Sequence, residues 1–262
     1  MKRSHIKLLC CLLCVCTVFS NIAIPSYAAF DVTTNVSSTG EDWTIQSDPS
    51  GFEYLLNIVT GEKIVRAFTY NEEGLLVEIS LEECLQIKKS SPSVNAIPAV
   101  DAAVNSVDYG TEDASTLRYE TVMYNYQETS TYQANGTPVK VSADSKGPAS
   151  ISYFISQTIS CSFGGNISLT TAYKNAISSG ASFSWNNTLS SQVQNGYTYP
   201  VPSGRTGYIR FTPYMNVTTG NLYQIYISSY GTEEKNLGTV WGYSPKALSN
   251  GIADGLYELV II

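Results

Sequence analysis

Apolar and polar residues alternate in two stretches near the middle of the chain. In residues 151–163 one parity is apolar except for Gln157, and the other is almost entirely serine and threonine. The same period of two returns in residues 181–193, directly after Gly180. Because successive side chains of a strand point to opposite faces, this pattern predicts two β-strands, each with one apolar and one hydroxyl-rich face. We expect these strands to pair as a long amphipathic, Ser/Thr-rich hairpin.

The apolar face of this hairpin has to be covered. A bilayer covers it if the hairpin spans a membrane, and a second sheet covers it in a β-sandwich. The pattern does not separate these two alternatives, so we predict that the side chains on this face contact either lipid or another sheet. They are Ile151, Ile155, Ile159, Phe183, Trp185 and Leu189.

Three shorter strand-like segments lie upstream and are separated by turn residues. This arrangement predicts a three-stranded meander. The segments are residues 52–59, 63–69 and 75–81. Ser80 followed by Glu83 resembles a capping box, so residues 81–88 are alternatively a short helix.

The remaining strand predictions come from turn signals and short β-prone segments. Asn135-Gly136 is a strong hairpin signal, which predicts that residues 138–143 pair back onto residues 117–128. Residues 172–177 fit either two helical turns or an extra strand. The downstream segments predicted to be strands are 197–201, 207–211, 222–229, 239–243 and 256–262.

Together these elements predict an all-β protein of antiparallel sheets, in an elongated or sandwich arrangement. Three regions follow from composition: an acidic N-terminal β-meander module at residues 29–88, a linker at 89–114, and a C-terminal β domain at 115–262. Between Asp144 and Glu233 the chain contains no carboxylate side chain. This asymmetry of charge supports a division into two parts.

The beginning of the chain has the features of a secretory signal. Basic residues precede an apolar run at residues 8–19, and Ser26 and Ala28 occupy the positions that a signal peptidase reads. A membrane-spanning helix needs about twenty apolar residues, more than this run provides. We therefore predict a signal peptide of residues 1–28, cleavage between Ala28 and Ala29, and a secreted, extracellular protein.

Loss of this signal would remove His5, the only histidine of the chain. A Ser-His-Asp triad, a Cys-His pair and an imidazole metal ligand are then excluded. Paired acids such as Glu72-Glu73 fit solvated turns better than the separated carboxylates of a glycosidase. We predict a protein that is not an enzyme and has no cofactor or metal. The remaining 12 basic and 22 acidic residues give a net charge of −10, which disfavours nucleic acid as a partner.

Cys84 and Cys161 are the two cysteines that remain after residue 28. An exported chain meets oxidising surroundings, so a disulfide between them is one prediction. Closing a loop of this length stabilises a fold by roughly 4–5 kcal/mol in the chain-entropy description. The alternative is that Cys161 packs on the apolar face of the hairpin, whose parity it shares.

The two alternating strands are rich in Ser and Thr and poor in acids, and they precede the segment Tyr199-Pro-Val-Pro-Ser-Gly-Arg-Thr-Gly-Tyr-Ile-Arg-Phe211. In these features residues 150–230 resemble the body of aerolysin-type β-pore-forming proteins. The resemblance implies an extended β protein that forms homo-oligomers and passes one amphipathic hairpin per subunit through a membrane. It also implies that the hairpin strands, or the segment between Gly164 and Gly180, supply the inserting part.

Two functions follow from this reasoning. The first is a secreted, non-enzymatic, membrane-active protein of the pore-forming kind, whose partners are a membrane or cell-surface component and further copies of itself. The second is a secreted or surface-associated β-sandwich that binds a protein or a glycan. The acidic N-terminal module matches no receptor-binding domain and does not favour either function.

Overall fold

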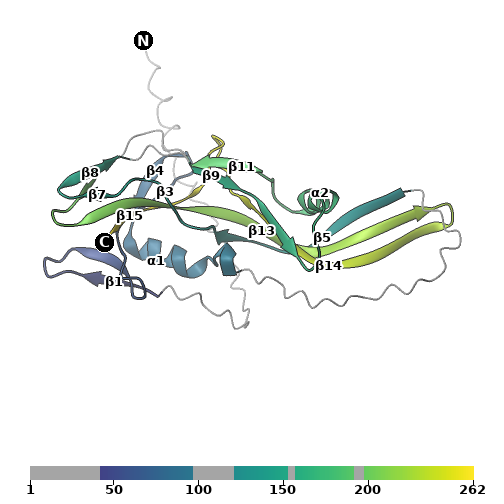
Figure 1. Ribbon diagram of the computed structural model, residues 1–262, viewed down its shortest axis with the longest axis horizontal. Coiled ribbons are helices and arrows are strands. Elements are labelled where there is room, and N and C mark those ends of the chain that lie inside the picture. The colour runs from purple at the N-terminus through teal and green to yellow at the C-terminus, as the bar shows by residue number, and fades with distance from the viewer. Residues whose placement is uncertain (1–41, 97–120, 153–156, 192–197) are drawn as a thin grey trace, which may run out of the picture. The chain divides into compact units, whose positions relative to one another are not determined.

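The computed structural model describes residues 42–96, 121–152, 157–191 and 198–262. Within them, antiparallel strands form most of the structure, which confirms the predicted all-β class (Figure 1). The predicted signal peptide with Ala28 and Ala29, residues 97–114 of the predicted linker and Ile155 lie outside the described residues.

The strands and helices in chain order are β1 Trp43–Ser47, β2 Glu53–Asn57, β3 Lys63–Tyr70, β4 Leu76–Ile79, α1 Leu81–Ser90, the 3₁₀ helix η1 Val94–Ala96, β5 Thr121–Asn135, β6 Val139–Lys140, β7 Ser145–Lys146, β8 Ala149–Ser152, β9 Gln157–Ser160, β10 Ser162–Gly165, α2 Thr171–Gly180, β11 Thr188–Ser191, β12 Thr198–Val201, β13 Thr206–Ser228, β14 Gly231–Pro245 and β15 Gly255–Ile261. Eleven of the strands form one sheet, with the central order β1-β2-β3-β15-β13-β14-β10. Two further sheets have two strands each, β9 with β11 and β8 with β12.

Strand β13 runs through most of the large sheet. It spans 23 residues and pairs first with β15 and then with β14. It also pairs with β5, β6 and β7, which follow one another along it. The predicted strands at 207–211 and 222–229 are therefore two parts of one strand, which passes through Pro213.

The predicted hairpin at Asn135-Gly136 is wrong. β5 and β6 do not pair with each other, because both pair with successive parts of β13. The backbone N–H of Gly136 donates to the carbonyl oxygen of Pro213 at 2.7 Å. A Cβ at Gly136 would lie 2.7 Å from the Pro213 side chain, so this glycine serves a close approach to β13 and not a chain reversal.

The predicted N-terminal meander exists but does not form a unit of its own. β3 pairs with β15, so β1 to β4 belong to the same large sheet as the C-terminal strands. Residues 38–262 accordingly form one compact unit. The helix alternative for residues 81–88 is confirmed, because α1 follows β4 and the Ser80 side chain caps it by accepting a hydrogen bond from the backbone N–H of Glu83 at 3.1 Å.

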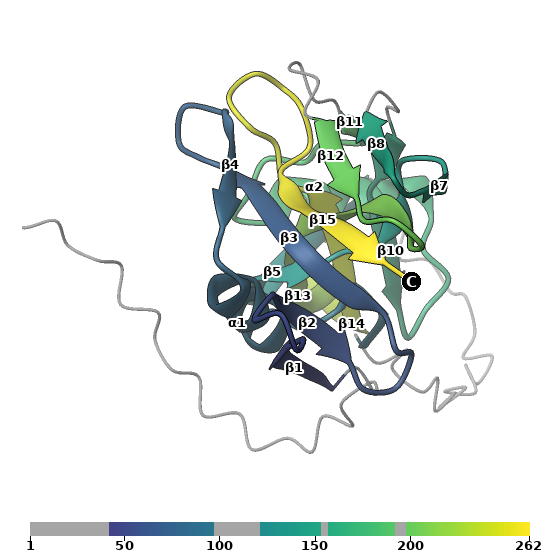
Figure 2. The same cartoon turned by 90° about the vertical axis from the view of Figure 1, so that its left-hand side faces the viewer.

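Two apolar clusters lie on opposite faces of the sheet around β15. Tyr257, Leu259 and Ile261 belong to the first core cluster, whereas Leu256 and Val260 belong to the second. The first cluster also contains residues of the small sheets β8–β12 and β9–β11, and the second contains residues of α1, β1 and β2. Figure 2 shows α1 on one side of β3 and β15, and β8, β11 and β12 on the other.

The long predicted hairpin is present in part, because residues 157–160 pair antiparallel with residues 188–191. Of residues 151–163, the structure describes 151–152 in β8, which pairs with β12, 157–160 in β9, which pairs with β11, and 162–163 in β10, which pairs with β14. Of residues 181–193, only β11 is a described strand. The alternating pattern predicts strand conformation, but it carries no information about the partner. Tertiary contacts direct β10 to β14 and leave residues 181–187 outside any strand.

The predicted disulfide is not formed, because both cysteines in the described part of the chain are free. Cys84 lies on the buried face of α1, in the second core cluster. Cys161 lies between β9 and β10, where its backbone N–H donates to the carbonyl oxygen of Asn187 at 3.1 Å. The two thiols therefore occupy different environments, and Cys84 serves as an apolar side chain of the core.

Candidate functional site

Strands β9 and β11 form the base of a long excursion of the chain. They pair antiparallel, from Ser160 opposite Thr188 to Gln157 opposite Ser191. We call residues 161–187, which lie between these two strands, the arm. The arm contains one charged side chain, that of Lys174, and no carboxylate.

Helix α2 forms the middle of the arm for local reasons. The Thr170 side chain accepts a hydrogen bond from the backbone N–H of Tyr173 at 3.3 Å and caps the first turn. The helix ends at Gly180, where a Cβ would lie 2.6 Å from the backbone oxygen of Tyr126. This outcome settles the sequence alternative for residues 172–177 in favour of a helix. A helix of ten residues is marginal alone in water, so α2 depends on its contacts with the sheet.

The arm packs its apolar side chains on the sheet formed by β5, β13 and β14, which we call the cradle (Figure 1). Ile177 of α2 is fully buried in a third core cluster with Tyr126, Leu222 and Val240 of the cradle. Burial of one such side chain contributes about 1.5–3 kcal/mol. The other arm residues against this cluster are Phe163, Ile167, Leu169, Tyr173, Ala176 and Trp185.

Aromatic rings lie over glycines where the arm meets β14. The indole of Trp185 covers Gly242, because a Cβ there would lie 2.5 Å from the ring. Gly164 of β10 lies opposite Trp241 of β14, and a Cβ at Gly164 would lie 2.3 Å from the Trp241 ring. Phe163 stacks on Trp185, with centroids 4.7 Å apart and planes 9° from parallel. The close contact between β10 and β14 therefore depends on Gly164 and Gly242, because a larger residue at either position would clash with a tryptophan ring.

This contact also contains two unsatisfied donors. The Nε1 atoms of Trp185 and Trp241 are buried and have no hydrogen-bond partner in the described part of the chain. A buried donor without a partner costs about 1–3 kcal/mol. The contact between arm and cradle thus combines favourable apolar burial with a polar penalty.

Glu128 provides one polar link between the arm and the cradle, beside the pairing of β10 with β14 and the hydrogen bonds between Asn186 and Ser244. Its Oε1 accepts hydrogen bonds from the backbone N–H of Ser182 at 3.3 Å and from the Thr218 hydroxyl at 2.6 Å. The Tyr126 hydroxyl lies 2.6 Å from the same Thr218 oxygen. Burial raises the pKa of Tyr126 to about 12, so this hydroxyl stays protonated. One carboxylate therefore joins the arm to both β5 and β13.

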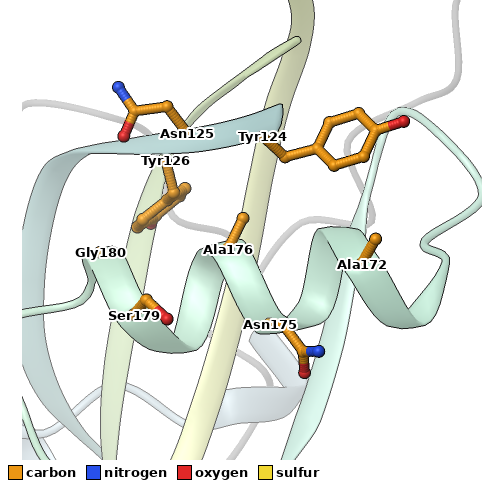
Figure 3. A pocket seen from close by; sticks show the side chains of 8 residues that line it. All are labelled: Tyr124, Asn125, Tyr126, Ala172, Asn175, Ala176, Ser179 and Gly180. Atoms are coloured by element: carbon orange, nitrogen blue, oxygen red, sulfur yellow. The ribbon is translucent and has the colours of Figure 1, made fainter. Parts of the chain in front are cut away.

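A cavity of about 420 Å³ lies between α2 and β5 (Figure 3). β5 contributes two tyrosines and an asparagine, and α2 contributes small and amide side chains. The lining residues are Tyr124, Asn125, Tyr126, Ala172, Asn175, Ala176, Ser179 and Gly180. Aromatic faces together with uncharged hydrogen-bonding groups suit a neutral polar ligand.

The predicted apolar face is split between two clusters. Ile151 and Ile159 lie in the first core cluster, and Leu189, directly opposite Ile159, packs against it. Trp185 packs against the third cluster, and the centroid of the Phe183 ring lies 5.0 Å from that of the Trp185 ring. In this structure these five side chains face other parts of the protein. The sequence did not indicate Glu128 or the cradle, because only the pairing of β5 with β13 brings them to the arm.

The described residues contain neither a cluster of metal-ligating side chains nor a long apolar helix. No three His, Cys, Asp or Glu side chains there gather as ligands of a metal ion would. None of the helices in those ranges is both long and apolar enough to cross a membrane.

Residues 121–234 match a family model described as a family of unknown function (DUF6060). The match runs from the start of β5 into the first part of β14, so it includes the whole arm and most of the cradle. A search of curated proteins and a search of solved structures found no match.

Proposed function

We propose that this is a secreted, non-enzymatic, membrane-active protein whose arm extends, together with β9 and β11, into an amphipathic hairpin that crosses a bilayer within an oligomeric pore. The register of β9 with β11 carries this proposal. It sets Ile159 opposite Leu189, and its continuation sets Phe163 opposite Trp185. Opposite residues of an antiparallel pair share one face, and the rings of Phe163 and Trp185 already stack.

The unused alternation of the sequence supports the same proposal. Residues 181–187 alternate as a strand does, yet they are not a strand in the docked arm. In the continued register, the mainly apolar parities of residues 151–163 and 181–193 fall on one face, together with Gln157, Asn187 and Ser191. The other face is hydroxyl and amide except for Phe154. Each segment has thirteen residues, and a tilted strand of about 9–11 residues crosses a bilayer.

The charge distribution makes such a transfer feasible. A charged side chain in the middle of a bilayer costs roughly 2.5–3.5 kcal/mol on insertion scales. The arm has no carboxylate, and Lys174 lies in α2, midway along it. In an extended hairpin this lysine is near the distal turn and reaches water on the far side.

A pair of engineered disulfides tests the proposal, in a chain lacking residues 1–28 and carrying Cys161→Ser. Ser162 and Tyr243 lie directly opposite each other in β10 and β14, within the Cα separation that a disulfide needs. Ser162→Cys with Tyr243→Cys therefore tethers the arm to the cradle. The matched control joins Ser160→Cys to Thr188→Cys, which closes the arm at its base but leaves it free to extend.

The readout is leakage of dye from phosphatidylcholine vesicles, with and without reductant. We expect the tethered variant to leak only after reduction and the base-closed variant to leak in both conditions. Equal leakage from the oxidised tethered variant, or no leakage from the unmodified chain at concentrations that saturate vesicle binding, contradicts the proposal.

The cavity between α2 and β5 favours a second function, a binding module for a neutral polar ligand such as a sugar. Its lining of two tyrosines, two asparagines and a serine is the observation that supports it. Thermal unfolding in the presence of a panel of oligosaccharides tests this function. A ligand at 100 times its Kd raises the stability by about 2.7 kcal/mol, and Tyr124→Ala should abolish that shift.

A further inference from the structure

The three strands of the cradle end together (Figure 1). β13 reaches its last pairs at Ile227 opposite Thr121 of β5 and Ser228 opposite Gly231 of β14. The turn between β13 and β14 is closed by the Ser228 hydroxyl, which accepts a hydrogen bond from the backbone N–H of Tyr230 at 3.2 Å. The end of this sheet is therefore a defined turn flanked by the start of β5.

Large apolar side chains surround this turn and are open to solvent. Tyr230 is 86% exposed, Met123 52%, Val122 43% and Ile227 37%. We call these four residues the tip. Strand alternation directs Met123 and Ile227 to one face of the sheet and Val122 to the other, so the apolar surface wraps around the end of the sheet.

We propose that the tip is the surface that first contacts a membrane and that its partner is the interface of a zwitterionic bilayer. This inference rests on the proposed function and names the part of the chain that meets the lipid before the arm moves. Tyrosine favours the bilayer interface, because its ring is apolar and its hydroxyl remains hydrated.

The order of side chains along the sheet supports a lipid partner. The first charged residues of β14 are Glu233, Glu234 and Lys235, three to five positions behind Tyr230. At a rise of about 3.3 Å per residue, they begin about 10 Å from the apex. Interfacial segments enter the headgroup and acyl boundary by about 5–10 Å. The apolar side chains of the tip then enter, and the charged side chains stay in water.

The net charge behind the tip selects the kind of lipid. Two carboxylates and one ammonium group give this part of β14 a net negative charge. An anionic leaflet repels such a surface. Zwitterionic lipid therefore fits the tip better than anionic lipid.

Co-sedimentation of the chain lacking residues 1–28 with vesicles tests this inference. We compare phosphatidylcholine vesicles with vesicles that also contain phosphatidylglycerol. The test variant is Tyr230→Asp. The matched control is Val59→Asp, which introduces the same charge at a residue that is 67% exposed in the turn between β2 and β3.

We expect Tyr230→Asp to weaken binding to phosphatidylcholine about tenfold, the effect of losing one buried apolar side chain. Val59→Asp should bind like the unmodified chain, and phosphatidylglycerol should weaken binding. Unchanged binding by Tyr230→Asp, no binding of the unmodified chain, or preference for the anionic vesicles overturns the inference. The inference is also overturned if the unmodified chain is a dimer in gel filtration and Tyr230→Asp is a monomer that still binds vesicles. The tip would then contact a second copy of the chain.

Binding and leakage measured on the same proteins and vesicles test this inference and the proposed function independently. Binding without leakage by the unmodified chain supports the tip and contradicts the pore. Leakage that Tyr230→Asp retains in full contradicts the tip and leaves the pore intact. The oxidised tethered variant should bind vesicles normally, since its tip is unchanged.

Discussion

Arg210 donates a hydrogen bond from Nε to Oε2 of Glu258 at 2.7 Å, and the Glu258 side chain is completely buried. The Lys88 ammonium lies 2.7 Å from the other oxygen of this carboxylate. Arg210 also pairs with Glu62 at 2.8 Å, and the Tyr208 hydroxyl donates to Glu62 at 2.6 Å. Two cations and two carboxylates thus join α1, β13, β15 and the turn before β3 within the second core cluster.

Glu258→Gln should therefore destabilise the protein strongly. Removing the buried charge leaves the Lys88 ammonium without its carboxylate and Arg210 with Glu62 alone. Breaking a buried ion pair in this way costs about 3–5 kcal/mol. The matched control is Glu78→Gln, because Glu78 pairs with Arg66 at the surface, where the two side chains are 46% and 38% exposed. That change should cost no more than about 1 kcal/mol. Urea unfolding monitored by tryptophan fluorescence measures both, and equal effects would contradict a stabilising role for the buried network.

The same network makes the stability depend on pH. Burial opposes ionisation of Glu258, but Lys88 and Arg210 outweigh it and lower its pKa below the ordinary value of 4.5. The pKa of Glu62 is also lowered, because the Tyr208 hydrogen bond and Arg210 outweigh burial. A lowered pKa in the folded state gives stability that is fully present above the unfolded pKa and is lost as the pH falls through the folded one.

We therefore expect a melting temperature that is nearly constant from pH 7 to pH 5 and that falls below about pH 4.5. In the Glu258→Gln variant the fall should be shallower, since one of the two carboxylates is gone. Thermal unfolding followed by circular dichroism at half-unit pH steps measures this dependence. A steeper fall in the variant than in the unmodified chain would contradict the assignment.

The fold class and the local elements could be predicted from the sequence because they depend on neighbouring residues. The capping box at Ser80 and Glu83 marks the start of α1, and alternation marks the strand conformation of β9 and β11. Strand partners could not be predicted. Asn135-Gly136 has the local signature of a hairpin, but its backbone continues along β13 and contacts Pro213. Such pairing depends on residues that are far apart in the sequence.

The candidate site was predictable in its position but not in its contacts. The alternating pattern indicated Phe183, Trp185 and Leu189, and all three lie in or next to the arm. Glu128 carries no sequence signal, because a single acid in a strand is usually a solvated side chain. Its contact with Ser182 exists only because α2 lies on β5. The sequence pattern also describes a longer strand than the docked arm contains, which is the discrepancy on which the proposed function depends.

The two free cysteines should react differently. Burial and the neighbouring Glu258 carboxylate raise the pKa of the Cys84 thiol to about 12, so almost no thiolate is present at pH 8. Cys161 is only partly buried. In a chain without residues 1–28, a thiol reagent should modify only Cys161 in the native state. It should modify both cysteines after denaturation. Absence of free thiols after denaturation would restore the disulfide prediction.

The hydrogen bond between Glu128 and Ser182 should help to hold the arm on the cradle, in addition to the pairing of β10 with β14 and the contacts of Asn186. Glu128→Ala removes the acceptor of both the Ser182 N–H and the Thr218 hydroxyl, which costs about 1–3 kcal/mol. Amide hydrogen exchange in the arm should then be at least about tenfold faster, whereas exchange in β15 should not change. Glu128→Gln keeps a carbonyl acceptor and should have a smaller effect.

Thr129→Ala is the matched control, because Thr129 is the next residue of β5 and its hydroxyl donates to the carbonyl oxygen of Thr219, at 2.9 Å, and not to the arm. Hydrogen exchange followed by mass spectrometry resolves peptides of the arm from those of β15. If release of the arm precedes insertion, Glu128→Ala should also leak vesicles faster than the unmodified chain, and Thr129→Ala should not. Faster exchange in the arm without faster leakage would show that another step limits insertion, and unchanged exchange would remove Glu128 from the contact that holds the arm.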